Sequence, residues 1–353
     1  MTSLVPWPLF AACAFGLTLL FVPLVRRLAW RVELVDRPRD ALHKSHQRPV
    51  PYGGGVAIYL GAVLPAACLM WTPLGQAAAD VRCVASLLGC ATVVLAVGLA
   101  DDWRPLPPMP RFAVQLLAAV LLLSVCPEFR LQILAADALT SALVTALWMV
   151  ALTNAFNFLD NMDGLAGGIA AIALALLAAM GGGPPDAVLL VVSLALLGAV
   201  SAFLVYNFPP ATIFMGDAGG FFIGFVVSSL SVLVSNRLGQ VQAGFVHGLA
   251  PLLVLAVPVY DQIGVTLIRM RNGVPPWVGD KNHISHRLVA LGLSRRTAVL
   301  VIHAATLATG ATALLIATTP TQLAWGLSFL FGVVAAAVAC LDAAARRRQH
   351  APA

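Results

Sequence analysis

Charged side chains are scarce in this chain: only 10% of its 353 residues are Asp, Glu, Lys or Arg. Soluble domains carry about 25% charged residues, so the composition excludes a soluble globular protein. No internal repeat, low-complexity segment or separate polar domain is visible, while 60% of the residues are hydrophobic. We therefore expect an all-α polytopic integral membrane protein whose single membrane-embedded domain covers residues 1–353.

Cysteine is also sparse and lacks any recognisable spacing. No C-x-x-C pair occurs, so the sequence supports neither a disulfide framework nor a zinc site. A basic n-region and an A-x-A-like cleavage site are missing at the N-terminus, which favours a retained first span over a cleaved signal. The net charge of +6 does not indicate nucleic-acid binding, because the basic residues lie in loops and in the tail. The six cysteines are Cys13, Cys68, Cys83, Cys90, Cys126 and Cys340.

What the sequence has in abundance is long apolar runs. A spanning helix needs about 20 apolar residues, and this rule predicts about eleven transmembrane helices, of which the fourth is short. They lie near residues 8–28, 53–71, 84–100, 112–126, 138–156, 165–181, 187–206, 219–235, 246–268, 298–316 and 323–341.

Basic residues divide very unevenly between the two sides of this arrangement. Eighteen of the 21 Lys and Arg fall on one side, and only Arg82, Arg130 and Arg237 fall on the other. By the positive-inside rule the first side is cytoplasmic, so we expect the N-terminus outside and the C-terminus inside. The polar motifs all fall on the cytoplasmic side, in segments 29–52, 101–111, 154–164, 207–218 and 269–297, ahead of a basic tail at 342–353.

The most polar short stretch lies between two apolar runs in the middle of the chain. If it is helical, Asn154, Asn157 and Asp160 step by three and share an arc of about 120°. Asp163 and the glycine after it predict the turn that ends this helix. Oxygen donors without Cys or a nearby His suit a hard cation such as Mg²⁺. The alternative is a short polar loop between two spans.

A basic segment follows the first span and includes Lys44 and His46. Its Pro-x-Pro element and three successive glycines predict a stiff turn with close backbone approach, suited to a phosphate-bearing ligand. The alternative is an ordinary loop that obeys the positive-inside rule.

An acidic pair and a single acid mark two further motifs. Asp101 and Asp102 close the third span, ahead of Arg111, and adjacent carboxylates there suit metal binding, proton abstraction or positioning. A solvated helix end is the alternative. Asp217 lies in an apolar, glycine-rich segment before a span, which makes it a candidate metal ligand, with a helix N-cap as the alternative.

The longest cytoplasmic loop carries the last motif. His283 and His286 step by three, so they could share a helix face with Arg287 nearby, a cluster suited to phosphate or sugar hydroxyls. Zinc is the rival ligand, but further N or S donors are not found locally. Asp261, which precedes this loop, is explained at least as well by structural pairing as by chemistry.

Together, in this order, the four motifs resemble the polyprenyl-phosphate N-acetylhexosamine-1-phosphate transferases of the glycosyltransferase 4 type. The most specific parts are N-A-F-N-F-L-D-N-M-D-G-L at 154–165 and P-A-T-I-F-M-G-D at 210–217. The resemblance runs from about Asp36 to Leu288, and it is greatest to the bacterial undecaprenyl-phosphate GlcNAc-1-phosphate transferases.

The resemblance implies a transfer of a sugar 1-phosphate from a UDP-sugar to undecaprenyl phosphate, which releases UMP and starts a lipid-linked cell-envelope polysaccharide. It implies Mg²⁺, with Mn²⁺ as a substitute, a bacterial inner membrane and a site that faces the cytoplasm. Asn157 and Asp217 match metal-binding positions. The catalytic acids implied are Asp101, Asp102, Asp160 and Asp163. Substrate binding is implied for Lys44, His46, Arg111, Asn154, Asn161, His283, His286 and Arg287.

Three residues depart from the family pattern. Arg111 stands where Lys is usual, Asn161 where Gly is usual, and Ser285 where the H-x-H-H block has its middle His. Ser285 leaves open which UDP-hexosamine is used. Direct attack, an aspartyl-phosphate intermediate and a homodimer also stay open. The alternative functions are a multi-span transporter, whose site would lie near the midplane between repeats, and a non-catalytic lipid-binding scaffold.

Overall fold

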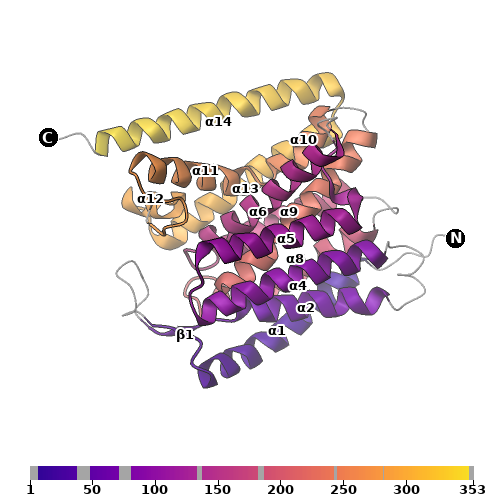
Figure 1. The fold of residues 1–353 in the computed structure, drawn as a ribbon. Helices are drawn as coiled ribbons and strands as arrows, with labels where there is room; N and C mark the ends of the chain where they lie inside the picture. Colours follow the sequence, from indigo (N-terminus) through magenta and orange to yellow (C-terminus); the bar gives the residue numbers. More distant parts are fainter. Residues whose placement is uncertain are drawn as a thin grey trace.

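The computed structural model of the chain describes residues 7–37, 48–70, 81–132, 137–181, 187–241, 245–280 and 282–349. Most of these residues form helices that run roughly side by side, and a two-residue antiparallel ladder pairs β1 (Val35–Asp36) with β2 (Val50–Pro51) (Figure 1). The helices are α1 (Trp7–Arg31), α2 (Gly54–Met70), α4 (Val81–Trp103), α5 (Pro108–Val125), η1 (Pro127–Phe129), α6 (Ala138–Leu159), α7 (Leu165–Gly181), α8 (Ala187–Asn207), α9 (Gly216–Val241), α10 (Phe245–Leu253), α11 (Ala256–Arg271), α12 (Ile284–Ala290), α13 (Arg295–Thr318) and α14 (Thr321–Gln349).

Local sequence signals set where several helices begin. The Asp137 carboxylate accepts the backbone N–H groups of Leu139 and Thr140, both at 3.0 Å, and so caps α6. The Ser294 hydroxyl caps α13 in the same way. Pro108 opens α5, where its missing N–H would have no helical partner anyway.

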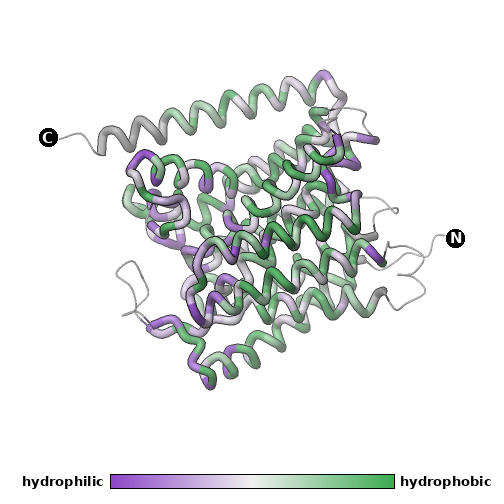
Figure 2. Tube along the Cα trace, viewed as in Figure 1, coloured by the Kyte–Doolittle hydropathy of each residue, from purple (hydrophilic) through white to green (hydrophobic). Residues whose placement is uncertain are grey.

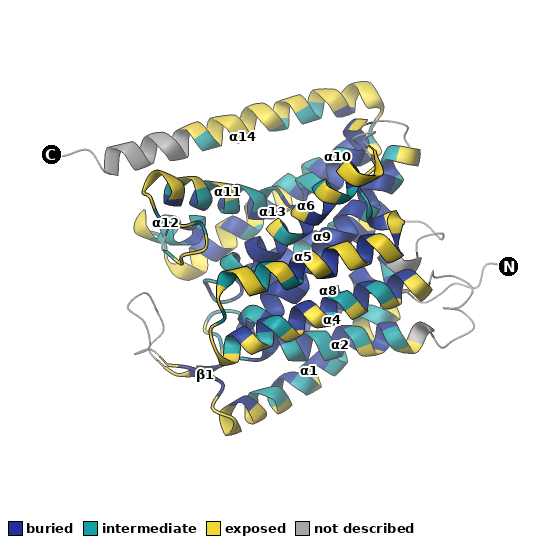
Figure 3. Ribbon diagram, in the orientation of Figure 1, coloured by how far each residue is buried: buried dark blue, intermediate teal, exposed yellow. Residues whose placement is uncertain are grey.

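Helix α9 is the centre of the bundle. It packs against α2, α4, α6, α7 and α10, and 94% of an apolar 18-residue stretch within it is buried. Helix α14 lies along the edge of the bundle, and only 6% of its apolar 18-residue stretch is buried (Figure 3). Because the outward faces of the peripheral helices are largely apolar, they suit contact with lipid.

The expected all-α polytopic membrane fold is confirmed. Among the described residues, eight helices are long and apolar enough to span a membrane, and the pair α10 and α11, bent by 72°, would make a ninth if it forms one span. Helix α7 and the stretch Gly54–Cys68 of α2 are apolar but shorter. Each of the predicted spans coincides with one of these elements, but the total of eleven stays a prediction.

Consecutive long helices run in opposite directions, so alternate loops meet at one end of the bundle (Figure 1). The ladder of β1 and β2, α12 and the connections after α4, α6 and α8 lie together at the left-hand end of that view. Apolar residues line the lengths of the helices, and hydrophilic residues gather toward their ends (Figure 2). Helix α1 begins at the opposite end from the one where α14 ends, as the predicted orientation requires; which end is cytoplasmic stays a prediction.

Candidate active site

The last turn of α4 and the first turn of α9 meet at the end of the bundle that carries the polar loops. Here Asp102 accepts the backbone N–H of Asp217 at 2.7 Å and that of Ala218 at 3.2 Å. The first N–H groups of a helix lack intrahelical partners, and a carboxylate there also complements the helix dipole. Both oxygens of Asp102 therefore hold the start of α9.

The backbones of α2 and α4 pack so closely against the start of α9 that two glycines there have no room for a side chain. A side chain at Gly98, one turn before the acidic pair in α4, would collide with the backbone of Ala218. A side chain at Gly55 in α2 would collide with the backbone of Gly219. The start of α9, and with it Asp217, is thus located by glycine contacts from two other helices.

Arg111 joins the other two acids of the cluster. Its Nη1 forms an ion pair with the Asp101 carboxylate and lies 3.6 Å from Asp217 Oδ2. Asp101 also accepts the Leu106 backbone N–H at 2.6 Å, which ties the loop after α4 to the site. The guanidinium places a positive charge between two carboxylates that would otherwise repel each other. The structure thus brings Asp101, Asp102, Asp217 and Arg111 together, as the motifs required.

The two predicted metal ligands can be tested against the geometry. Asn157 Oδ1 is buried and has no hydrogen-bond partner among the described residues. It faces Gly220, one helical turn beyond Asp217 in α9. Asp217 keeps a third of its side chain exposed. An orphaned amide oxygen close to a partly open carboxylate is a donor set that fits a hard cation such as Mg²⁺.

The turn between α6 and α7 is tied to the loop before α9. Helix α6 ends at Leu159, and the turn that follows it contains Asp163 and Gly164, as the sequence predicted. Asp163 Oδ2 accepts the Ala211 N–H at 2.8 Å, and Asn207 Oδ1 accepts the Gly164 N–H at 2.9 Å. Gly164 adopts a φ of 76°, in the left-handed region that glycine favours, just before α7 begins. Asp163 and Asn207 therefore fix the two loops to each other.

Asp160 lies at the end of α6, beside the start of α9. Burial and then the negative charges of Asp102 and Asp163 raise the pKa of Asp160 well above its ordinary value, while the Gly216 N–H opposes them. Asn154 lies two turns earlier in α6, where its Nδ2 donates to Gln115 Oε1 at 2.6 Å. Asn154 is thus buried between α5 and α6, away from the solvent-facing end of the site.

Tyr52 is a residue near the acids that the sequence motifs did not single out. The segment around it forms a ladder with the loop before α9: the Phe214 N–H donates to Pro51 O and the Gly54 N–H donates to Phe214 O, each at 2.9 Å. Burial, and then the charge of Asp36, raises the pKa of the Tyr52 hydroxyl. The three glycines were a sequence signal for close backbone approach here, but they did not point to the tyrosine.

The His283 block adopts a different arrangement from the predicted one. His283 is the N-cap residue of α12, so it does not share a helix face with His286. Its Nδ1 lies 2.6 Å from Asp261 Oδ2, and Asp261 Oδ1 accepts the Ile284 N–H at 2.7 Å. Structural pairing of Asp261 is confirmed, and its partner is a histidine from the predicted site. His286 and Arg287 are partly exposed on α12.

Two further predictions concern residues near this end of the bundle. Asn161 Oδ1 accepts a hydrogen bond from the Ser285 hydroxyl at 2.6 Å, which links the turn after α6 to α12. The substrate-binding roles of Lys44 and His46 stay predictions, because both residues lie outside the described part of the chain.

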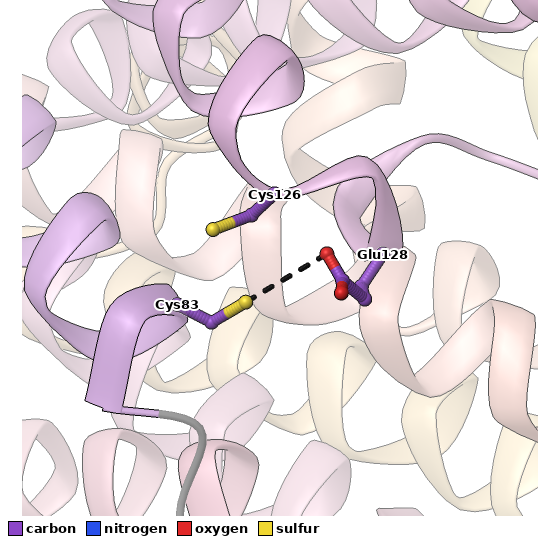
Figure 4. A group of neighbouring side chains, drawn as sticks. All are labelled: Cys83, Cys126 and Glu128. Carbon is purple, nitrogen blue, oxygen red and sulfur yellow. Dashed lines mark hydrogen bonds between the residues drawn. The ribbon is translucent and has the colours of Figure 1, made fainter.

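A second cluster lies at the opposite end of α4. The thiols of Cys83 and Cys126 and the carboxylate of Glu128 lie within 4.8 Å of one another (Figure 4). No sequence motif indicated this group, because 43 positions separate the two cysteines. Arg82 Nη2 donates to Glu128 at 3.0 Å and Cys83 Sγ donates to it at 3.7 Å. This cation already neutralises the carboxylate, so the cluster is explained as a link between α4 and η1.

Comparison with known proteins supports the motif assignment. The family model described as glycosyl transferase family 4 matches residues 84–235. The Bacillus subtilis protein named "Probable undecaprenyl-phosphate N-acetylglucosaminyl 1-phosphate transferase" is 34% identical over 295 residues, which cover 81% of this chain and 78% of that protein. The chain belongs to glycosyl transferase family 4.

Two other relatives of this family 4 transferase cover a similar share of its length. The decaprenyl-phosphate N-acetylglucosaminephosphotransferase of Mycolicibacterium smegmatis is 33% identical and covers 79% of the chain and 74% of its own length. The undecaprenyl-phosphate alpha-N-acetylglucosaminyl 1-phosphate transferase of Escherichia coli K12 is 27% identical, over 82% and 78%. These names place the chain among the phosphoglycosyltransferases, as its motifs predicted.

Proposed function

We propose that this transferase moves a sugar 1-phosphate, GlcNAc-1-phosphate in the first instance, from a UDP-sugar to undecaprenyl phosphate and releases UMP. The relatives in Bacillus subtilis and Escherichia coli are named for undecaprenyl phosphate and N-acetylglucosaminyl 1-phosphate, and the Mycolicibacterium protein is named for decaprenyl phosphate. The product would start a lipid-linked cell-envelope polysaccharide.

The observation that carries this proposal is the arrangement at the start of α9. Asn157 offers a buried amide oxygen without a partner, Asp217 offers a partly open carboxylate, and Arg111 lies against two of the acids. Two anionic phosphates must meet in this reaction, so a site for it needs both a cation and fixed basic groups.

Asn157 and Asp217 are the residues that would hold Mg²⁺. The bound ion would supply positive charge that offsets the negative charge of the phosphates. Arg111 would orient a phosphate by donating N–H groups from a planar guanidinium, while Asp101 holds that guanidinium in place. Asp102 would act indirectly, because its two oxygens position the backbone that carries Asp217.

The location of the site suits a reaction between a lipid and a soluble sugar nucleotide. The acids lie at helix ends, where a polyprenyl phosphate held in the bilayer and a water-soluble UDP-sugar can meet. We assign this end of the bundle to the cytoplasm of a bacterial inner membrane, because eighteen of the 21 Lys and Arg fall on the corresponding side.

The test is a reconstituted reaction. Purified protein in detergent is incubated with undecaprenyl phosphate, Mg²⁺ and one of several UDP-hexosamines, and UMP release is measured, with chelator and the Asp217→Asn variant as controls. We expect UMP with UDP-GlcNAc only when Mg²⁺ and the lipid are both present. If no UDP-sugar gives lipid-dependent UMP, the proposed function is wrong, and uptake of the same nucleotides into vesicles would then test the transporter alternative.

A further inference from the structure

One hydrogen bond connects the acidic turn to the helix that carries His286 and Arg287. The Ser285 hydroxyl donates to Asn161 Oδ1 at 2.6 Å, and the two residues are 124 positions apart in the chain. Asn161 also donates from Nδ2 to the Phe158 carbonyl at 2.7 Å, which fixes the orientation of its amide. The oxygen of that amide is therefore directed to α12 by the end of α6.

The surroundings of this bond are tightly packed. Ser285 is 0% exposed. Its neighbour His283 is held by Asp261, and the His283 ring lies 6.0 Å from the ring of Phe158. Arg269 of α11, which is 1% exposed, contacts the same ring: its guanidinium lies 5.2 Å from the centroid of Phe158. Phe158 and Asn161 thus form the surface against which α11 and α12 pack.

Arg269 holds the loop between α11 and α12 in place. Its Nε donates to Asp280 Oδ2 at 2.9 Å, and its Nη1 donates to the Pro276 carbonyl at 2.5 Å. The loop between α11 and α12 is therefore held to the end of α11 by one buried side chain. A direct polar contact between this unit and the acidic turn is the bond from Ser285 to Asn161.

We propose that Asn161 and Ser285 are a matched pair of positioning residues that set the distance between the metal-binding acids and the sugar-nucleotide-binding face of α12. This inference rests on the proposed function and adds to it the two residues that determine how the donor half of the site is placed. Asn161 lies between Asp160 and Asp163, so a shift of its amide moves α12 relative to the acids.

Asn161 and Ser285 are also two positions at which the sequence departs from the pattern of the family that it resembles. Asn161 stands where the family usually has Gly, and Ser285 stands where it usually has His. The structure shows that these two positions touch, so a larger residue on the turn faces a smaller residue on the helix. Because Ser285 is buried and touches the half-buried Asn161, a larger side chain at position 285 needs a smaller one at position 161.

The first test is a double-mutant cycle with steady-state kinetics. Ser285→Ala and Asn161→Ala should each raise the KM for UDP-GlcNAc about tenfold, and the double variant should be no worse than either single variant, because each removes the same bond. The KM for undecaprenyl phosphate should stay within twofold. Ser294→Ala is the matched control: its hydroxyl is also hydrogen-bonded, but it caps α13 at an exposed position, and its kinetic constants should not change.

The second test exchanges the sizes of the two residues. Ser285→His should be impaired, because an imidazole there would occupy the space of Asn161, and Asn161→Gly in the same chain should restore the KM for UDP-GlcNAc to within about threefold. The combined variant decides the matter even if Ser285→His alone does not fold. A combined variant that stays as impaired as Ser285→His overturns the matched pair.

Other outcomes separate the pair from its alternatives. Single effects that multiply to about a hundredfold in the double variant would show two independent residues, against the proposal. Equal rises in KM for donor and lipid would show general loosening, also against it. Thermal unfolding of the same variants is measured in parallel: coupling in the unfolding midpoint without coupling in KM would reduce the pair to a structural contact. A wild-type protein that releases no UMP would refute the proposed function itself, which none of the variant outcomes can do.

Discussion

The carboxylate of Asp102 accepts the backbone N–H of Asp217 at 2.7 Å, although the two residues are 115 positions apart. One of the two acids thus holds the helix turn from which the other points into the site. Adjacent acids at 101 and 102 therefore have separate tasks: Asp101 pairs with Arg111, and Asp102 holds the start of α9.

Replacing Asp102 should affect stability in graded steps. Asp102→Ala leaves two N–H groups at the start of α9 without an acceptor, which should cost about 1–2 kcal/mol, and Asp102→Asn, which keeps one acceptor, should cost less. Thermal unfolding in detergent checks the order, with Arg104→Gln as an exposed control. A stable Asp102→Asn that has lost as much turnover as Asp217→Asn would show instead that Asp102 acts on substrate.

Replacing Asp217 should affect turnover. Asp217→Asn removes a charge from the predicted metal site, and we expect a loss of at least about 100-fold, as for other groups that stabilise a charged transition state. Raised Mg²⁺ or Mn²⁺ should recover part of the loss, because the defect lies in metal binding. UMP release across a metal titration measures both effects. Near-normal turnover at ordinary Mg²⁺ would remove Asp217 from the set of metal ligands.

Arg111 should tolerate one substitution and not another. Arg111→Lys keeps the positive charge between Asp101 and Asp217 and introduces the residue usual in the family, so turnover should stay within about tenfold. Arg111→Gln removes the charge and should cost at least about 100-fold. Arg104→Gln, an exposed change on the same segment, is the matched control. Equal losses for the Lys and Gln variants would show that the guanidinium geometry, not its charge, is required.

Asp280 should stabilise the loop before α12 in a pH-dependent way. Partial burial alone would raise the pKa of Asp280, but hydrogen bonds from Arg269 and Asn282 outweigh it and hold the pKa below its ordinary value. A depressed folded pKa means that the stabilisation is present above the unfolded value, about 3.9, and is lost as pH falls through the folded value. The difference in unfolding midpoint between wild type and Asp280→Asn should therefore be constant from pH 8 to 5 and shrink below pH 4. A difference that vanishes near pH 6 would contradict this account.

The orientation of the bundle can be tested by labelling. In a variant whose native cysteines are replaced, Gln240→Cys at the end of α9 should react with a membrane-impermeant maleimide in intact cells. Gly279→Cys, in the loop before α12, should react only after permeabilisation. Both positions belong to the described chain and have exposed residues. Labelling of position 279 in intact cells would reverse the arrangement.

The sequence alone was sufficient to locate the helices and the polar motifs. Each expected span coincides with a helix or, for 246–268, with the bent pair α10 and α11, because the apolar length that a membrane requires is a local property of the chain. The polar residues within such a sequence were also recognisable as candidate site residues, since a charge in an apolar run is costly and seldom lacks a function. Asp101, Asp217 and Arg111 were found in this way, and the structure brings them together.

Only the tertiary structure decided what each polar side chain contacts. Asp102 became a helix cap, Asn154 an interhelical contact and Asp261 the partner of His283, because helix crossings determine which groups lie within hydrogen-bond distance. The bond from Ser285 to Asn161 is of the same kind. In the sequence these two residues were separate departures from a pattern, and in the folded chain they are one contact. A hydrogen bond depends on a separation of about 3 Å between two atoms, and no local pattern determines that separation for residues on different helices.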